Sequence, residues 1–382
     1  SAFLNKSQRI GTPRGLHCTS SIYSACISSA ASRLPSESPN IILMIGDGMG
    51  LTQITSGMYS NNNKVALEDF QYIGLSKTHS YDNLVTESAA GATAMSTGKK
   101  TNNGVLGLDH MGNPQKSILF ICQDKGYSTA LVATSNILHA TPAAFFANID
   151  DRYKYEDIAD QMTKSGINYF VGGGEQYFNS RKDKRNIINE MSKNGYEFVY
   201  NISDFEKNKS DYIGFFTAKD EPYYVYNRKD EPVELFKERE PYLARSTKST
   251  LEKLKELGNP FFIMIEGSQI DWGGHDNDQE YMISQFLEFN QTIEVVLEFA
   301  KKDKNTIVVV TADHETGGAA IVRGDLSSST IKNLFATPNH TASMVPVFSF
   351  GPNAHLFKGI YENTEIFNKL LSIVEKWKEF LF

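Results

Sequence analysis

Residues 40–50 read Asn-Ile-Ile-Leu-Met-Ile-Gly-Asp-Gly-Met-Gly, an apolar run that ends at Asp47. A continuous apolar run of this length is typical of a strand that is buried on both faces, as strands are in parallel sheets. Similar runs recur along the chain, at residues 129–133, 169–172, 260–266, 306–311 and 345–350. The stretch therefore predicts the first strand of a mainly parallel sheet.

Segments with helical periodicity separate these runs, at residues 117–125, 155–165, 184–194, 242–257, 278–302 and 364–380. Strands that alternate with helices indicate an α/β fold, in which helices cover both faces of a mainly parallel central sheet. We expect residues 39–382 to form a single α/β domain. A stretch near 173–240 is rich in Lys, Asp, Asn and Tyr, and we expect irregular surface structure there.

The first residues differ in composition from the rest of the chain. Residues 1–36 contain no Asp or Glu and many serines. This composition is typical of a leader or targeting segment. Because the chain starts at Ser1, these residues can equally be a tail left by expression. We therefore exclude residues 1–38 from the fold argument, and we expect a periplasmic or secreted protein.

Charge and apolar patterning exclude several classes of partner. The chain has 382 residues, with 38 Lys and Arg against 45 Asp and Glu, which gives a formal charge of −7. This balance argues against nucleic acid as a dedicated partner, which usually requires a basic face. No stretch approaches the roughly 18–20 apolar residues of a membrane span. The three cysteines are too few for a disulfide framework.

Carboxylates and histidines follow the ends of several predicted strands. In a parallel sheet these ends meet at one edge, where ligands bind. Each residue alone is as well explained as a helix cap or a surface group, but so many acids at one edge are costly unless cations neutralise them. Imidazole with carboxylate suits zinc, and carboxylate with hydroxyl suits magnesium. The predicted metal-binding residues are Asp47, Glu266, Asp271, His275, Asp313, His314 and His340, with His139 and Thr141 close by.

Ser88 is the candidate nucleophile. It precedes a run of small residues, Ala-Ala-Gly-Ala-Thr-Ala, that predicts a tightly packed helix with Ser88 at its N-terminus. Free amides and the helix dipole stabilise an anion at such a position. A serine needs a base or a metal to become nucleophilic, and with acids around it metal activation is the better interpretation. The alternative is that Ser88 only caps the helix.

Seven motifs together resemble the alkaline phosphatase family over most of residues 40–355. They are Gly46-Asp-Gly-Met-Gly50, Thr86-Glu-Ser-Ala-Ala90, Ser96-Thr-Gly-Lys-Lys-Thr-Asn-Asn-Gly104, His139-Ala-Thr-Pro-Ala-Ala144 with Arg152, Glu266-Gly-Ser-Gln-Ile-Asp271 with His275, Thr311-Ala-Asp-His-Glu315, and His340-Thr-Ala-Ser343. The resemblance implies the alkaline-phosphatase-like α/β fold and a hydrolase with a three-metal site.

The resemblance also implies how the metals are held. One zinc ion would bind Asp271, His275 and His340. A second zinc would bind Asp47, Asp313 and His314 beside Ser88. Magnesium would bind Asp47, Thr141 and Glu266, and His139 lies next to that set.

The same resemblance implies the reaction. Ser88 would attack phosphorus and form a phosphoserine, while Arg152 would hold two phosphate oxygens through its planar fork. The implied function is metal-dependent hydrolysis of phosphate monoesters at alkaline pH, by an enzyme that is a homodimer in the habit of its family.

Three residues depart from the usual family pattern. Glu87 stands where Asp is usual, His139 where many members have Asp, and Trp272 where many members carry Lys or His. His139 should weaken the retention of magnesium, and Trp272 should modulate phosphate binding, unless it merely packs against the rim of the site. The pair resembles certain bacterial members from cold environments, which implies a cold-adapted enzyme.

Alternative functions stay open at this point. A phosphodiesterase or phosphomutase of the same superfamily would keep the metals but change the surroundings of the nucleophile. A non-catalytic protein that binds metal or phosphate could also use this fold. Ser88 followed by Ala-Ala-Gly, with Arg152 later in the chain, favours a phosphomonoesterase.

Overall fold

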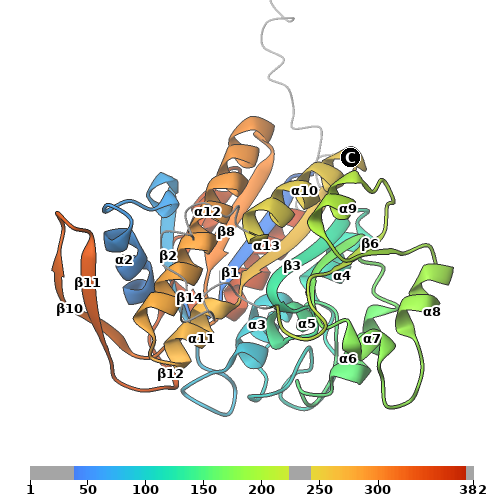
Figure 1. Cartoon of the computed structure of the whole chain (residues 1–382), viewed down its shortest axis with the longest axis horizontal. Coiled ribbons are helices and arrows are strands. Elements are labelled where there is room, and N and C mark those ends of the chain that lie inside the picture. The colour runs from blue at the N-terminus through green and yellow to red at the C-terminus, as the bar shows by residue number, and fades with distance from the viewer. Residues whose placement is uncertain (1–37, 223–241, 376–382) are drawn as a thin grey trace, which may run out of the picture. The chain divides into compact units, whose positions relative to one another are not determined.

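The computed structural model of the chain describes residues 38–222 and 242–375 (Figure 1). The apolar run that opens this range forms β1 (Asn40–Gly46), and all seven of its residues are buried. The proposed leader or tail segment lies outside the described residues, apart from Ser38. The last part of the helix expected over 364–380 also lies outside them.

Ten strands of the described chain form one sheet, and β1 lies near its middle. The strand order is β14-β2-β13-β8-β1-β7-β3-β4-β6-β5. Only β13 (Val345–Phe350) runs antiparallel to its neighbours, β2 and β8. The expectation of a mainly parallel sheet is therefore confirmed. The other strands are β2 (Tyr72–Lys77), β3 (Ser128–Asn136), β4 (Tyr169–Gly173), β5 (Glu197–Val199), β6 (Ile213–Phe216), β7 (Phe261–Gly267), β8 (Thr306–Thr311) and β14 (Gly359–Glu362).

Alternate side chains of β1 pack into two separate hydrophobic cores. Ile41, Leu43 and Ile45 enter one core, and Ile42 and Met44 enter the other. A strand whose two faces are both buried has no polar face, which explains why its sequence is continuously apolar. The fold class expected from the sequence, α/β with both faces of the sheet covered, is confirmed.

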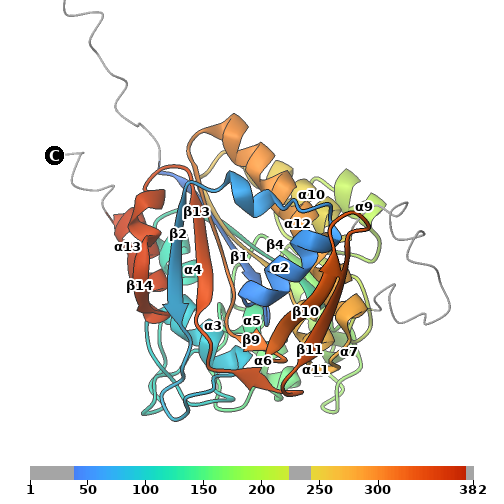
Figure 2. The same cartoon turned by 90° about the vertical axis from the view of Figure 1, so that its left-hand side faces the viewer.

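Helices cover both faces of the sheet, which Figure 2 shows nearly edge-on. One face packs against α3 (Ser88–Thr97), α4 (Ile118–Asp124), α5 (Ala140–Ala143), α6 (Tyr155–Met162), α7 (Gln176–Asn179), α8 (Ile187–Lys193) and α13 (Thr364–Glu375). The other packs against α2 (Leu51–Ser60), α9 (Ile202–Lys207), α10 (Tyr242–Glu256), α11 (Gln269–His275) and α12 (Gln279–Asp303). No helix of the described residues is long and apolar enough to cross a membrane.

Several strands near the sheet edges were not predicted from the sequence. β2 and β14 pair side by side at one edge, and both are partly exposed. Because an exposed edge strand needs fewer apolar residues, its sequence carries little signal. The hairpin of β10 (Ala319–Asp325) and β11 (Thr330–Phe335) is also largely exposed and was missed for the same reason. The pair of β9 (Glu315–Thr316) and β12 (His340–Thr341) was missed because each strand has only two residues.

The stretch near 173–240 is more regular than its composition indicates. Its described part contains β5, β6, α7, α8 and α9. Aromatic side chains provide the missing core, because Phe216 packs against Phe170, Phe178 and Phe198 with ring centroids 4.9–5.7 Å apart. Such spacing is typical of stabilising aromatic pairs. A few large rings thus order a segment that is otherwise polar.

The carboxyl ends of β1, β7, β8 and β3 lie at the same edge of the sheet. Ile45 is in register with both Glu266 and Thr311, and Ala133 is in register with Glu266. These strands therefore end at about the same level of the sheet, and the residues that follow them begin close together. In Figure 1, α5 and α11, which follow β3 and β7, gather with α3 and β12 along the lower edge of the fold.

Candidate active site

A tight turn after β1 brings Asp47 toward two other acidic segments. Gly48 has a φ of +69°, and a side chain there would lie 2.8 Å from the Cα of Asp271. Only glycine accepts both this left-handed conformation and this close approach at little cost. The Gly48 amide donates to Oδ1 of Asp313 over 3.2 Å. The turn therefore joins the ends of β1 and β8 to helix α11.

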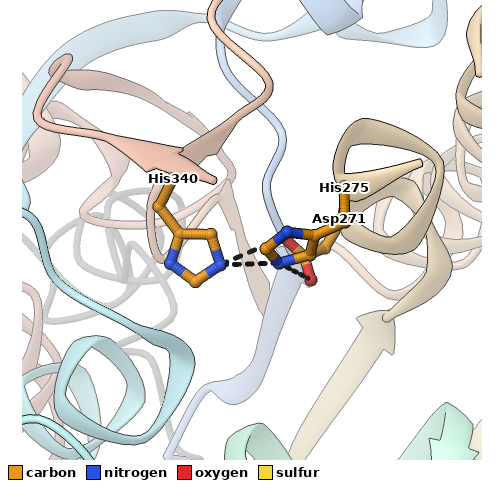
Figure 3. Close-up of side chains that lie close together, drawn as sticks. All are labelled: Asp271, His275 and His340. Carbon is orange, nitrogen blue, oxygen red and sulfur yellow. Dashed lines mark hydrogen bonds and ion pairs between the residues drawn. The ribbon is translucent and has the colours of Figure 1, made fainter. Parts of the chain in front are cut away.

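Asp271, His275 and His340 form the first cluster (Figure 3). Asp271 and His275 lie one turn apart on α11, and His340 comes from β12. The Nε2 atoms of the two histidines are 3.0 Å apart. Oxygens of Asp271 lie 3.3 Å from Nε2 of His275 and 3.4 Å from Nε2 of His340.

The opposite ring nitrogens show which way these histidines point. Nδ1 of His275 lies 2.6 Å from the carbonyl oxygen of Pro338, and Nδ1 of His340 lies 2.9 Å from that of Thr86. Because a carbonyl only accepts, both Nδ1 atoms carry protons, and in both rings Nε2 is the nitrogen that faces the cluster. This orientation is the one that metal-binding histidines adopt. The cluster attracts positive charge: contact with Asp271 raises the pKa of His275 to about 9.

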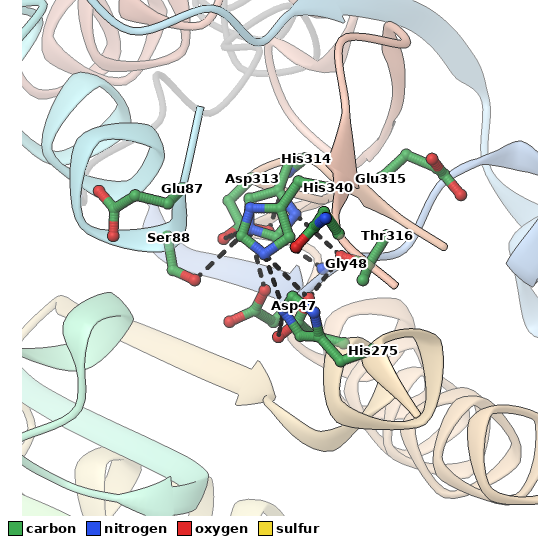
Figure 4. A network of polar contacts seen from close by, with 12 residues as sticks. Asp47, Gly48, Glu87, Ser88, His275, Asp313, His314, Glu315, Thr316 and His340 are labelled. Atoms are coloured by element: carbon green, nitrogen blue, oxygen red, sulfur yellow. Dashed lines mark hydrogen bonds and ion pairs between the residues drawn. The ribbon is translucent and has the colours of Figure 1, made fainter. Parts of the chain in front are cut away.

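Asp47, Asp313 and His314 form the second cluster (Figure 4). Nε2 of His314 lies 3.5 Å from Oδ1 of Asp47 and 3.2 Å from Oδ2 of Asp313. All three side chains are fully or almost fully buried. Burial lowers the pKa of His314 well below its usual value, so the ring is neutral and presents a lone pair rather than a proton.

Thr316 fixes the orientation of His314. Its hydroxyl donates to Oδ1 of Asp271 and lies 3.2 Å from Nδ1 of His314. Since the single hydroxyl proton goes to the carboxylate, the hydroxyl oxygen accepts the Nδ1 proton of His314. The lone pair of His314 therefore sits on Nε2 and faces Asp47 and Asp313.

Asp47, His139 and Glu266 form the third cluster, in which one ligand atom of each lies within 4.8 Å of the others. Asp47 thus belongs to two clusters. The hydroxyl of Thr141, at the start of α5, is buried and has no hydrogen-bond partner among the described residues. These four residues combine carboxylate, hydroxyl and imidazole, which matches the set expected for the third metal.

The buried acids are suited to divalent cations. Both carboxylate oxygens of Asp47, Oε1 of Glu266 and Oδ2 of Asp313 lack a hydrogen-bond partner among the described residues. Burial raises the pKa of Glu266 to about 8 and of Asp313 to about 6, and raises that of Asp47 well above its usual value. Unpaired oxygens of this kind are costly unless a cation binds them. The residues present therefore fit a multi-metal centre.

Ser88 is the first residue of α3 and is 3% exposed. The cap of this helix is Glu87, whose carboxylate accepts from the amides of Ala89 and Ala90 over 3.0 and 2.7 Å. Ser88 is therefore not the capping residue, and its hydroxyl stays available. Its Oγ lies 3.4 Å from Nε2 of His314, at the edge of the second cluster.

Arg152 lies between Glu87 and His139. Its Nη1 donates to Oε2 of Glu87 over 2.5 Å, and its Nη2 lies 3.1 Å from Nε2 of His139. Because a guanidinium only donates, Nε2 of His139 accepts this hydrogen bond. Burial and the charge of Arg152 lower the pKa of His139 to about 3, so the ring is neutral. Arg152 is thus held at the site, with its Nε atom unpaired among the described residues.

Trp272 stands beside His139 at the rim. The two rings are 6.2 Å apart and meet edge to face at 78°. Trp272 follows Asp271 on α11 and is only partly buried. Of the three residues that depart from the common pattern, Glu87 and His139 therefore contact Arg152, and Trp272 packs against His139.

The predicted site residues all lie in or beside the three clusters. Three neighbours of these clusters were not predicted from the sequence: Gln53, Glu315 and Thr316. Of these, only Thr316 contacts a predicted metal-binding residue through its side chain. Their signal was weak, because polar residues after a histidine or inside a helix are common. Within the motif at 311–315, only Asp313 and His314 were predicted to bind metal.

Comparison with known proteins gives consistent matches over most of the chain. The family model for alkaline phosphatase matches residues 38–336. Alkaline phosphatase 3 of Bacillus subtilis is 39% identical over 328 residues, which cover 82% of this chain and 67% of that protein.

Solved structures give the same result. Alkaline phosphatase from the Antarctic bacterium TAB5 superposes with a TM-score of 0.81 at 38% identity, over 89% of this chain and 98% of that one. A His-to-Asp variant of the TAB5 enzyme, with magnesium bound in its M3 site, has the same TM-score and identity and covers 89% of this chain and 99% of its own.

Proposed function

This chain belongs to the alkaline phosphatase family, whose members hydrolyse phosphate monoesters with the help of metal ions, and we propose that Ser88 is its nucleophile. The observation that carries the proposal is the position of the Ser88 hydroxyl at the edge of buried clusters that require cations, with Arg152 beside the same helix terminus. A surface serine that only capped a helix would have neither neighbour.

We propose that the three clusters hold two zinc ions and one magnesium ion. The first zinc site is Asp271, His275 and His340, and the second is Asp47, Asp313 and His314. Magnesium would take Asp47, Thr141 and Glu266, with His139 adjacent. Bound cations would neutralise the buried acids, make Ser88 easier to ionise and stabilise charge on the attacking and leaving oxygens. The magnesium in the M3 site of the TAB5 variant supports a third site of this kind.

The side chains of this protein would bind the phosphate and then transfer it. Arg152 would hold two oxygens of the phosphate, because its planar fork matches a pair of oxygens. Ser88 Oγ would then form a bond to phosphorus as the ester oxygen leaves with its alcohol. Water would cleave the phosphoserine, releasing phosphate and restoring Ser88. Glu87 anchors both the helix that starts at Ser88 and the guanidinium of Arg152.

His314 is a poor candidate for a general base, although it is the nearest imidazole to Ser88. Its pKa lies well below the usual value because the ring is buried and close to His340. A base works best when its pKa lies near the working pH. Ionisation of Ser88 by bound cations is therefore the better account.

Two assays test this proposal. Elemental analysis of active protein should find about three divalent ions per chain, in line with the three clusters. Activity on p-nitrophenyl phosphate should be lost on chelation and should exceed activity on bis-p-nitrophenyl phosphate, which separates a monoesterase from a diesterase. Active protein with less than about one divalent ion per chain would contradict the metal-dependent mechanism.

We also propose that the enzyme is a homodimer, as its family resemblance implies. Large apolar side chains that are exposed on loops support a contact surface for a second chain: Leu84 is 74% exposed and Met111 is 71% exposed. Sedimentation equilibrium of the metal-loaded protein should give twice the mass of one chain. A mass equal to one chain across the concentration range would contradict the proposal.

A further inference from the structure

Glu315 is a buried carboxylate that immediately follows two residues of the second cluster but points away from them. It is 5% exposed. Figure 4 shows its side chain directed away from the cluster, whereas Thr316 reaches toward it. Successive side chains of a strand alternate between faces, which explains this division. Glu315 therefore does not bind a metal with the neighbouring residues.

Four donors from three parts of the chain converge on this carboxylate. Gln53 of α2 donates to Oε1 over 2.7 Å, and the Thr341 hydroxyl of β12 donates to Oε2. The amides of Gly318 and Ala319 donate over 3.3 and 3.2 Å. A buried carboxylate is costly, and these hydrogen bonds offset the cost only while all four donors stay in place.

The segments joined in this way carry the predicted metal-binding residues. Gln53 lies six residues after Asp47, and its amide also donates to the carbonyl of Thr316 over 2.7 Å. Thr341 directly follows His340. Across the β9–β12 pair, Thr341 faces Glu315, and His340 faces Thr316. Glu315 thus links the strand of His340 to the helix that follows Asp47.

Besides the contacts of Glu315, this strand is held by its pairing with β9 and by Nδ1 of His340, which lies 2.9 Å from the carbonyl oxygen of Thr86. β9 and β12 are two residues long, and two short strands are not stable on their own. His340 must nevertheless keep its Nε2 within 3.0 Å of that of His275 and 3.4 Å of Asp271. Substituting Gly50 would disturb the same link, because a side chain there would lie 2.4 Å from Cγ of Glu315.

We propose that Glu315 is a positioning residue of the active site. Through Thr341 and Gln53 it holds β12 so that His340 completes the first cluster. This inference rests on the proposed metal sites, since the position of His340 matters for zinc only if His340 binds it. Residues around a metal site that orient its ligands typically change metal affinity by about 10- to 100-fold when they are replaced.

The test is zinc affinity, measured by competition with a chromophoric chelator on the whole protein. Glu315→Gln keeps the shape but removes one accepting oxygen, and Thr341→Val removes the hydroxyl without changing the size. In both variants the affinity for one zinc ion should fall by about tenfold or more, and the affinity for the other zinc ion should not change. Thr341→Ser restores the hydroxyl and should restore the affinity.

Glu288→Gln is the matched control. Glu288 is also a buried carboxylate that accepts from a backbone amide, that of Leu243 over 2.9 Å, but it lies in the middle of α12. The zinc affinities of the Glu288→Gln variant should equal those of the unmodified protein. Thermal unfolding of the metal-free proteins is measured alongside, because a merely structural role would lower the unfolding temperature without selecting one zinc equivalent.

Two outcomes would overturn the proposal, and they differ from failure of the metal assignment. If Glu315→Gln and Thr341→Val bind every zinc equivalent as tightly as the unmodified protein, Glu315 does not position His340. The same conclusion follows if the affinities for all zinc ions fall and the unfolding temperature of the metal-free protein falls with them. His340→Ala separates the two ideas: if it retains every zinc equivalent, the proposed first zinc site is wrong, whatever Glu315 does.

Discussion

The hydroxyl oxygen of Ser88 lies 3.4 Å from Nε2 of His314, the nitrogen that bears the lone pair of that ring. The two residues are 226 positions apart in the chain. Ser88 starts a helix on one side of the site, and His314 follows β8 on the other. The contact places the proposed nucleophile beside the second cluster rather than beside a free base.

Replacing Ser88 by Ala should abolish the phosphoenzyme and lower kcat by roughly 10²- to 10⁴-fold, because water must then attack the ester directly. Brief reaction with a ³²P-labelled monoester, followed by peptide mapping, measures the intermediate. Ser96→Ala is the matched control: Ser96 lies on the same helix, and its hydroxyl donates to the backbone carbonyls of Thr93 and Ala144 rather than to a residue of the clusters. Label on a peptide without Ser88 would show that the assignment is wrong.

Replacing Arg152 by Lys should raise KM and weaken product inhibition by phosphate by about 10- to 100-fold. A lysine keeps the charge but loses the planar fork, and charge-assisted hydrogen bonds contribute about 1.5–3 kcal/mol each. Steady-state kinetics with inorganic phosphate as inhibitor measure both quantities. Arg181→Lys, which changes a buried arginine paired with Asp183 away from the clusters, should leave them unchanged. Equal phosphate inhibition in both variants would exclude a clamp at Arg152.

Replacing Trp272 by Lys should lower the inhibition constant of phosphate. A lysine there would bring a positive charge to the rim beside His139 and could reach bound phosphate through a water, whereas tryptophan offers one neutral donor. Tighter product binding should also slow turnover if release limits it. Trp272→Phe serves as the control for lost packing. Should Trp272→Lys bind phosphate no more tightly than the unmodified protein, Trp272 only packs at the rim.

Replacing His139 by Asp should raise the affinity for magnesium. The change adds a carboxylate beside Asp47 and Glu266, and hard oxygen ligands suit magnesium better than imidazole does. Magnesium titration of the metal-depleted protein, followed by elemental analysis, measures the affinity. His139→Asn is the control, since it supplies an oxygen without the charge. A magnesium affinity that is the same in His139→Asp and the unmodified protein would remove His139 from the third site.

Replacing Glu288 by Gln should stabilise the protein at alkaline pH. Burial raises the pKa of Glu288 to about 7 from an ordinary value of 4.5. The folded state therefore binds a proton on Glu288 more tightly than the unfolded state does. The stability that this proton gives the folded state is lost as the pH rises from about 4.5 to about 7. The loss amounts to up to about 3 kcal/mol in the free energy of unfolding.

Glutamine has no such loss, and its amide oxygen can still accept from Leu243. Denaturant unfolding of both proteins at pH 5 and at pH 8.5 measures the difference. The advantage of Glu288→Gln should be larger at pH 8.5. An equal difference at the two pH values would show that Glu288 does not titrate in this window.

The chemistry of the buried strands made much of the fold predictable. A strand that is covered on both faces must be apolar throughout, so β1, β8 and β13 could be placed with their observed bounds. The acids and histidines that follow such strands could be assigned to one edge of the sheet, because parallel strands share a direction. Partly exposed strands such as β2 and the edge strand β14 have no comparable requirement and were missed.

By itself, the sequence determined the buried strands, the helix that begins at Ser88 and the residue types available for metal binding. Only the tertiary structure decided how those residues are oriented. The Nε2 atoms of His275 and His340 face one another because the carbonyls of Pro338 and Thr86 hold their other nitrogens. Such partners come from distant parts of the chain, so the direction of a side chain depends on contacts that form only when the sheet and its loops have assembled.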